Sequence, residues 1–270
     1  MAEAALRVAA GARYGGSVAS ARPEEIPMSE RVAIVVGVGA EAGLGARLCT
    51  RFGREGLHVL VGGRTAERIE SVADAIRGAG GAATAVVTDT TREADVLRLF
   101  ACADAIAPGA LEVAIFNAGN NAMLKFVEME ASFFEDTWRV ACFGGFLVGR
   151  EAARRMSKQG QGTVLFTGAS ASLRGKPPFA AFASAKAGLR AVAQSMAREF
   201  GPEGVHVAHV IIDGGIAGER LQRFVDFVRA KGEDGLLDLD AIADTYWMLH
   251  QQHRTAWTHE LDLRPFKEPF

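Results

Sequence analysis

Short apolar runs alternate with longer amphipathic stretches along most of the chain. From Arg31 onward, runs rich in Val, Ile and Leu are followed by stretches with hydrophobic positions at helical spacing. The runs predict strands at 32–38, 58–63, 83–88, 111–116, 162–168, 205–212 and within 259–265. Long helices are expected near 131–158, 179–200 and 239–254. Because buried strands joined by helices are typical of α/β proteins, we predict a doubly wound, seven-stranded parallel sheet with helices on both faces.

The first 28 residues do not share this alternation. They are rich in Ala, Gly and Arg and show no clear period. They represent a transit peptide, a tail or the product of an upstream start codon, and Met28 is an alternative start just before the first strand. We therefore predict a poorly structured extension over 1–28 and a single domain over 29–270.

Composition narrows the kinds of partner. The chain has 270 residues, 49% of them hydrophobic, and 30 basic against 32 acidic residues give a net charge of −2. This balance does not favour nucleic acid or an anionic membrane as a partner. No apolar run approaches the length of a membrane span, so we expect a small-molecule substrate instead.

The cysteines and histidines predict neither a metal site nor a disulfide framework. Cys49, Cys102 and Cys142 are widely spaced and odd in number. His206 and His209 fall in one predicted strand at an odd offset, which places them on opposite faces. We expect a cytoplasmic protein with reduced thiols.

The first predicted strand leads into the sequence GVGAEAGLGARL at 37–48. Its glycines follow the spacing G-x-x-x-G-x-G at a strand-to-helix turn, where backbone N–H groups and the helix N-terminus can approach a pyrophosphate. The sheet is therefore predicted to be of the Rossmann type and to bind a dinucleotide. The residues expected to contact it are Gly39, Gly43, Leu44 and Gly45.

The end of the second predicted strand bears on which dinucleotide is bound. A free ribose hydroxyl is usually met by Asp or Glu at this place, and a 2′-phosphate by Arg. Here Gly63 is followed by Arg64, with no carboxylate nearby in the sequence. We predict NADP(H) over NAD(H), the alternative being that Arg64 is an ordinary solvated charge at a helix start.

A charged side chain interrupts the apolar sequence FASAKAGLRAVAQSMA at 182–197. Phe182 and Lys186 are four residues apart and are expected to share one helix face. Lys186 is either a surface lysine whose stem covers apolar neighbours or a residue with a polar ligand as its partner.

Several of these motifs resemble the short-chain dehydrogenase/reductase family, and the resemblance extends over 31–265. The glycine loop matches the family's cofactor loop, Phe116-Asn117-Ala118-Gly119 is similar to its Asn-Asn-Ala-Gly segment, and Lys186 is similar to the lysine of its Tyr-x-x-x-Lys motif. The resemblance implies that Lys186 holds the nicotinamide ribose. It also implies cofactor contacts from Asp89, Thr90, Asn117, Ala118, Gly119, Gly214 and Ile216.

The chain departs from the family pattern where the family donates a proton. Phe182 stands in place of the tyrosine, and Ala169 in place of the serine thirteen residues before it. Neither tyrosine of the chain, Tyr14 or Tyr246, is placed to replace it. The remaining departures are Ala141 for Asn, Asp213 for Pro and Gly218 for Thr.

Other polar residues are candidates for the missing role. Ser170 is one place beyond Ala169, and we take it with Lys186 and Phe182 as the catalytic set. Further candidates for a donor or a substrate contact, each of which can equally make an ordinary local hydrogen bond, are Ser172, Ser184, Asn120, Asn121 and Lys125.

Two functions follow from these residues. The first is an NADP(H)-dependent oxidoreductase that transfers a hydride to or from a small apolar carbonyl, alcohol or enone with an atypical proton donor. Phe179, Phe182 and Met123 near the expected cleft suggest the apolar character of the substrate. The alternative is a catalytically silent NADP(H)-binding member that acts as a sensor or partner subunit.

The long helices also suggest assembly. Gly144 and Gly145 are expected to permit close approach of another backbone, and chains of this family usually form a homodimer or homotetramer. The aromatic and prolyl ending at 259–270 is expected either to close over a neighbouring subunit or the cleft, or to fray.

Overall fold

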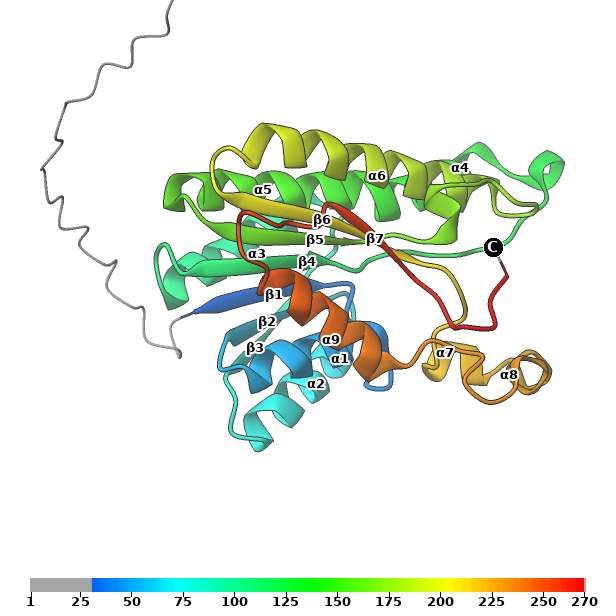
Figure 1. Cartoon of the computed structure of the whole chain (residues 1–270), viewed down its shortest axis with the longest axis horizontal. Coiled ribbons are helices and arrows are strands. Elements are labelled where there is room, and N and C mark those ends of the chain that lie inside the picture. The colour runs from blue at the N-terminus through cyan, green and yellow to red at the C-terminus, as the bar shows by residue number, and fades with distance from the viewer. Residues whose placement is uncertain (1–30, 270) are drawn as a thin grey trace, which may run out of the picture.

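The computed structural model describes residues 31–269, which form one sheet covered by helices on both faces (Figure 1). All neighbouring strands are parallel, in the order β3-β2-β1-β4-β5-β6-β7. The predicted fold is therefore confirmed, whereas the extension predicted over 1–28, with Tyr14, lies outside the described residues. The strands are β1 (Val32–Val36), β2 (His58–Gly63), β3 (Ala83–Val87), β4 (Leu111–Phe116), β5 (Gly162–Thr167), β6 (Val205–Ile212) and β7 (Glu260–Leu263).

The helices divide between the two faces, and each face has its own apolar core. Ala33 and Val35 of β1 pack with residues of α1, α2 and α9, while Val32, Ile34 and Val36 pack with residues of α3, α5 and α6. Because both faces of the central strand β1 are buried, its five residues are all apolar instead of alternating. The helices are α1 (Leu44–Arg54), α2 (Ala66–Gly78), α3 (Glu93–Ile106), α4 (Ala131–Trp138), α5 (Gly144–Gln159), α6 (Ala180–Phe200), α7 (Glu219–Gln222), α8 (Val225–Lys231) and α9 (Leu239–His250).

Two predicted helices have different bounds in the structure. The helix expected over 131–158 consists of α4 and α5 joined by a π-helical turn, Arg139–Phe143. The helix expected over 239–254 ends at His250, because residues 251–258 form turns that lead into β7.

Gly144 and Gly145 permit close approach of a neighbouring segment, but that segment belongs to the same subunit. A Cβ on Gly144 would lie 2.8 Å from Thr90 Oγ1, and one on Gly145 would lie 2.3 Å from Leu189 Cδ1. Both glycines therefore face the interior of the subunit. Their missing side chains let α5 approach the loop after β3 and the side chains of α6.

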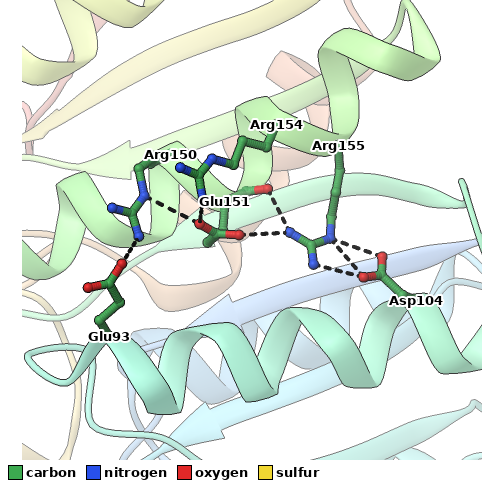
Figure 2. A network of polar contacts seen from close by, with 6 residues as sticks. All are labelled: Glu93, Asp104, Arg150, Glu151, Arg154 and Arg155. Carbon is green, nitrogen blue, oxygen red and sulfur yellow. Dashed lines mark hydrogen bonds and ion pairs between the residues drawn. The ribbon is translucent and has the colours of Figure 1, made fainter.

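Helix α5 is also tied to α3 by a network of charged side chains (Figure 2). The carboxylate of Glu151 is buried and pairs with Arg150, Arg154 and Arg155. Arg155 also binds Asp104 of α3 at 2.7 Å, and Arg150 binds Glu93 at the start of α3. A buried carboxylate is tolerated when it is paired in this way, so the network holds α3 and α5 together on one face of the sheet.

The C-terminal segment lies against the region of α8. Lys231 Nζ is 2.5 Å from Glu268 Oε2, and Lys267 Nζ donates to the carbonyl oxygen of Glu233 at 2.5 Å. Pro265 is close enough to Gly214 that a Cβ on that glycine would lie 2.7 Å from Pro265 Cδ. The ending is thus held within the subunit beside the segment that follows β6.

Within residues 31–269, no helix has both the length and the apolar character needed to cross a bilayer. The three cysteines are free thiols.

Candidate active site

Lys186 is buried in α6 at the carboxyl ends of the strands. Only 4% of the residue is exposed, and its Nζ donates to the carbonyl oxygen of Thr167, the last residue of β5, at 2.7 Å. The ring of Phe182, one turn earlier, has its centroid 5.9 Å from the same nitrogen. The predicted shared helix face is confirmed by this contact, and the surface-lysine interpretation is wrong because the sheet edge and α6 enclose the side chain.

Burial strongly affects the charge on Lys186. Removal from water lowers the pKa of its ammonium group from 10.5 to about 8. An ammonium group has three N–H donors, and among the described residues Thr167 provides its one hydrogen-bond acceptor. Two donors remain for oxygen atoms of a ligand, which fits the pair of hydroxyls on a ribose.

The loop after β4 forms the wall beside Lys186. A Cβ on Gly119 would lie 3.2 Å from Lys186 Nζ, so the absence of a side chain on this glycine leaves space beside the nitrogen. Asn117 connects the same loop to the loop after β1, because its Nδ2 donates to the carbonyl oxygen of Gly37 at 3.3 Å. Three segments that are distant in the sequence therefore meet around Lys186.

The glycine loop lies between β1 and α1, as predicted. Gly43 immediately precedes α1, and a Cβ on Gly45 would lie 2.9 Å from the carbonyl oxygen of Gly37. Gly39 has no atom within 4 Å of its Cβ position, so the loop is open on that side. The backbone N–H groups at the start of α1, including that of Leu44, form the kind of anion site that a pyrophosphate requires.

Gly37 also belongs to this loop, although it is not among the residues expected from the sequence. Its φ of +84° and the 2.4 Å separation between a Cβ position and Ala118 N leave no room for a side chain. In the sequence Gly37 lies inside the strand predicted over 32–38, and its contact with Ala118 depends on the loop after β4.

Arg64, the residue after β2, is exposed to solvent. Gly63 packs so closely on β1 that a Cβ there would lie 2.3 Å from the carbonyl oxygen of Val38. Arg64 is exposed, and it makes no hydrogen bond or ion pair with any described residue. Its guanidinium is therefore available to a ligand at the edge of the glycine loop.

Asp89 and Thr90 lie in the turn after β3. Asp89 Oδ1 accepts hydrogen bonds from the backbone N–H and the hydroxyl of Thr91, at 2.9 and 2.8 Å. Thr90 is buried against Gly144. The local bonds fix the turn, and no hydrogen bond to a described residue occupies Asp89 Oδ2.

The segment after β6 crosses to the glycine loop. The backbone N–H of Glu219 donates to the carbonyl oxygen of Ala42 at 2.9 Å. A Cβ on Gly218 would lie 2.9 Å from the same oxygen, so glycine permits this contact. Gly214 and Ile216 precede it in the same segment, and Ile216 pairs with Leu237 in an isolated parallel bridge.

Several candidate donors are occupied elsewhere. Ser172 is buried and accepts the backbone N–H of Ala169, while Ser184 donates to the carbonyl oxygen of Ala181. The hydroxyl of Tyr246 is buried against Thr167 Oγ1 at 2.7 Å. By contrast, the hydroxyl of Ser170 makes no hydrogen bond to a described residue.

The candidate substrate contacts after β4 are exposed. Asn120 accepts a hydrogen bond from Arg220 Nη2 at 3.4 Å, and Lys125 pairs with Glu128 at 3.1 Å. Asn121 and Met123 are exposed without a polar partner among residues 31–269. The backbone N–H of Leu124 donates to the carbonyl oxygen of Pro178 at 3.0 Å. This hydrogen bond joins the loop after β4 to the loop before α6.

A buried histidine lies beneath the loop that carries Ala169. His209 Nδ1 is 3.0 Å from Glu260 Oε2, and its Nε2 is 3.4 Å from Ser172 Oγ. Burial lowers the pKa of His209 to about 4, so the ring is neutral at ordinary pH. His206 instead stacks on Trp257, and the described residues contain no cluster of three groups suited to a metal.

Comparison with known proteins agrees with this geometry. The family described as "short chain dehydrogenase" matches residues 31–223. A curated relative, the uncharacterized oxidoreductase YuxG of Bacillus subtilis, is 34% identical over 202 residues, which are 74% of this chain but 29% of that protein. The chain thus spans less than a third of that relative's length.

Solved structures are similar over nearly the whole described region. A short-chain dehydrogenase from Rhodopseudomonas palustris is 42% identical with a TM-score of 0.76, covering 88% of this chain and 99% of that one. Actinorhodin polyketide ketoreductase, solved with NADPH, has a TM-score of 0.80 at 19% identity over 90% of this chain and 99% of its own. The second likeness concerns the fold alone. Together with the family match, the first shows that the chain belongs to the short-chain dehydrogenase family.

Proposed function

We propose that this chain is an NADP(H)-dependent oxidoreductase that transfers a hydride to or from a small, largely apolar carbonyl, alcohol or enone. The observation that carries the proposal is the buried ammonium group of Lys186, which has one protein acceptor and faces the opening left by Gly119. Burial of an amine costs free energy, and a ribose diol that accepts its free N–H groups would offset that cost. Members of the family bind a nicotinamide cofactor.

The chain's own residues divide the binding task. The N–H groups at the start of α1 bind the pyrophosphate, and Arg64 binds the 2′-phosphate through a bidentate contact. Asp89 and Thr90 border the adenine, and Asn117, Ala118, Gly119, Gly214 and Ile216 line the nicotinamide side. When bound, the nicotinamide supplies or accepts the hydride.

The proton has an unusual source in this proposal. Phe182 has the ring but no hydroxyl, so the proton comes from Ser170, from water or from the substrate itself. Ser170 is favoured over Ser172 and Ser184 because its hydroxyl has no acceptor among the described residues. An enone suits such a site, because hydride addition gives an enolate that can be protonated in solution.

We expect purified protein to oxidise NADPH in the presence of at least one member of a panel of aldehydes, ketones and enones. Loss of absorbance at the nicotinamide band measures this directly. Tight NADPH binding with no turnover across the panel would favour the alternative, a silent NADP(H)-binding member. Absence of binding to either coenzyme would contradict both.

Replacing Arg64 with Ala is expected to weaken NADPH binding by about 10- to 100-fold, the range for a lost hydrogen bond to a charged group. NADH binding should be unchanged, since NADH lacks the 2′-phosphate. Calorimetric titration with both coenzymes measures the difference. Arg68→Ala is the matched control, because Arg68 is also exposed and has no partner among the described residues. Equal affinity of the wild-type protein for NADH and NADPH would argue against the assignment.

We also propose that the protein is cytoplasmic and forms a homodimer or homotetramer. A groove between α5 and α6 supports self-association, because Phe146, Val192 and Phe200 line it together with Arg154 and Glu199. A second copy of the chain packed on this groove would bury its apolar lining.

A further inference from the structure

Asp213, which stands where the family has a proline, is a buried carboxylate at the end of β6. Only 2% of the residue is exposed. Arg174 Nη2 donates to both of its oxygens, at 3.2 and 3.1 Å, and Arg264 Nη2 lies 3.0 Å from Oδ2. A carboxylate in such a place needs paired cations to remain charged, and here two guanidinium groups contact Asp213.

The two arginines are not equivalent. Arg264 also binds Asp262 through Nε and Nη2, at 3.1 and 2.8 Å, and 15% of its side chain is exposed. Arg174 has 36% of its side chain exposed, and Asp213 is its single side-chain partner among residues 31–269. The Nε and Nη1 groups of Arg174 therefore remain as donors on a guanidinium that a buried carboxylate holds in position.

The position of Arg174 relates it to the candidate active site. It follows the turn Ser170–Ser172, since its backbone N–H donates to the carbonyl oxygen of Ser170 at 3.1 Å. Asp213 begins the segment that contains Gly214. Strands β5 and β6 are adjacent, with Thr167 paired with Val210, and the carbonyl of Thr167 binds Lys186. The Arg174–Asp213 pair thus connects the two loops that follow these strands, on the edge of the sheet where Lys186 lies.

We propose that Arg174 is a specificity residue that binds a carboxylate on the substrate. The free Nε–H or Nη1–H of the guanidinium can donate a charge-assisted hydrogen bond to a carboxylate, and the attachment of Arg174 to Asp213 reduces the conformational freedom lost on binding. The substrate is then a carbonyl compound or alcohol with an apolar body and one anionic end. The apolar side chains near the cleft contact the body, and Arg174 binds the end remote from the nicotinamide. This inference rests on the proposed oxidoreductase function.

The test uses oxo acids paired with their methyl esters, from 4-oxopentanoate to 4-oxocyclohexanecarboxylate. Each pair has the same reactive carbonyl and differs in the anionic group. We expect kcat/KM with NADPH to be about 10- to 100-fold higher for the acid than for its ester in at least one pair, mainly through KM. Equal values for acid and ester throughout would overturn the proposal.

Variants assign any such preference to Arg174. Arg174→Met should lower kcat/KM for the acid more than for the ester and so remove the preference for the acid, while Arg174→Lys should retain part of that preference. Lys176→Met is the control, because Lys176 is an exposed cation in the same loop with no partner among the described residues. An equal loss for acid and ester in Arg174→Met, or the same loss in Lys176→Met, would overturn the assignment.

The result remains decisive in the absence of turnover. Calorimetric titration of the same acids and esters into the NADP⁺-saturated protein should show acid binding that Arg174→Met abolishes. If neither coenzyme binds, the proposed function fails, and titration into the free protein still tests Arg174. Should Arg174→Met fail to fold, Arg174→Lys and the wild-type comparison of acid with ester carry the test.

Discussion

Replacing Lys186 with Met is expected to weaken NADPH binding by about 10- to 100-fold and to abolish turnover, because the ribose loses a charged hydrogen-bond donor. The same change should not unfold the protein. The pKa of Lys186 falls from 10.5 to about 8 on burial, and one pKa unit is 1.36 kcal/mol, so the charged amine costs about 3 kcal/mol near neutral pH. Methionine of similar length removes that cost, so the free energy of unfolding should stay equal or rise.

The pH dependence provides a second measurement on the same residue. Between the folded pKa of about 8 and the unfolded value of 10.5, the unfolded chain holds more protons, so stability contributed by this group rises with pH in that window. NADPH affinity should change in the opposite direction and fall as pH rises through about 8, because the ammonium group is lost. Lys186→Met should show neither change, and the exposed Lys158→Met serves as control. Undiminished coenzyme affinity in Lys186→Met would refute the role proposed for this lysine.

Introducing the tyrosine and the serine that the family resemblance implies is expected to raise activity. In Phe182→Tyr with Ala169→Ser, the reduction of simple ketones should increase by about 10²- to 10⁴-fold, the usual contribution of a positioned proton donor. The ring of Phe182 already lies near Lys186, at 5.9 Å from Nζ. A tyrosine there would have its pKa lowered by the adjacent ammonium group, which favours proton exchange.

Kinetics under saturating NADPH distinguish this gain from a change in binding, because kcat should rise while the coenzyme affinity stays constant. Phe179→Tyr is the matched control, since it adds a phenol just before α6 without placing it one turn from Lys186. A double variant that binds NADPH and remains as slow as the wild-type protein would show that the site lacks more than these two groups.

Local sequence patterns predict much of this fold for a clear physical reason. Strands β2, β4 and β6 begin and end where the apolar runs do, because strands buried on both faces are formed mainly by apolar residues. The pattern is less informative for α4 and α5, where the π-helical turn Arg139–Phe143 interrupts a continuous apolar periodicity. It also misplaces Gly144 and Gly145, since periodicity does not say which neighbour a small residue faces.

The sequence alone determines the family resemblance, the glycine loop, the shared face of Phe182 and Lys186, and the absence of a tyrosine at position 182. These features depend on residue type and spacing along one segment. Only the tertiary structure decides that Lys186 is buried against Thr167 and Gly119, and that Asp213 pairs both with Arg174 and with Arg264, the residue after β7. Such contacts join residues that are close in space because parallel strands bring their carboxyl ends to one edge, whatever their distance along the chain.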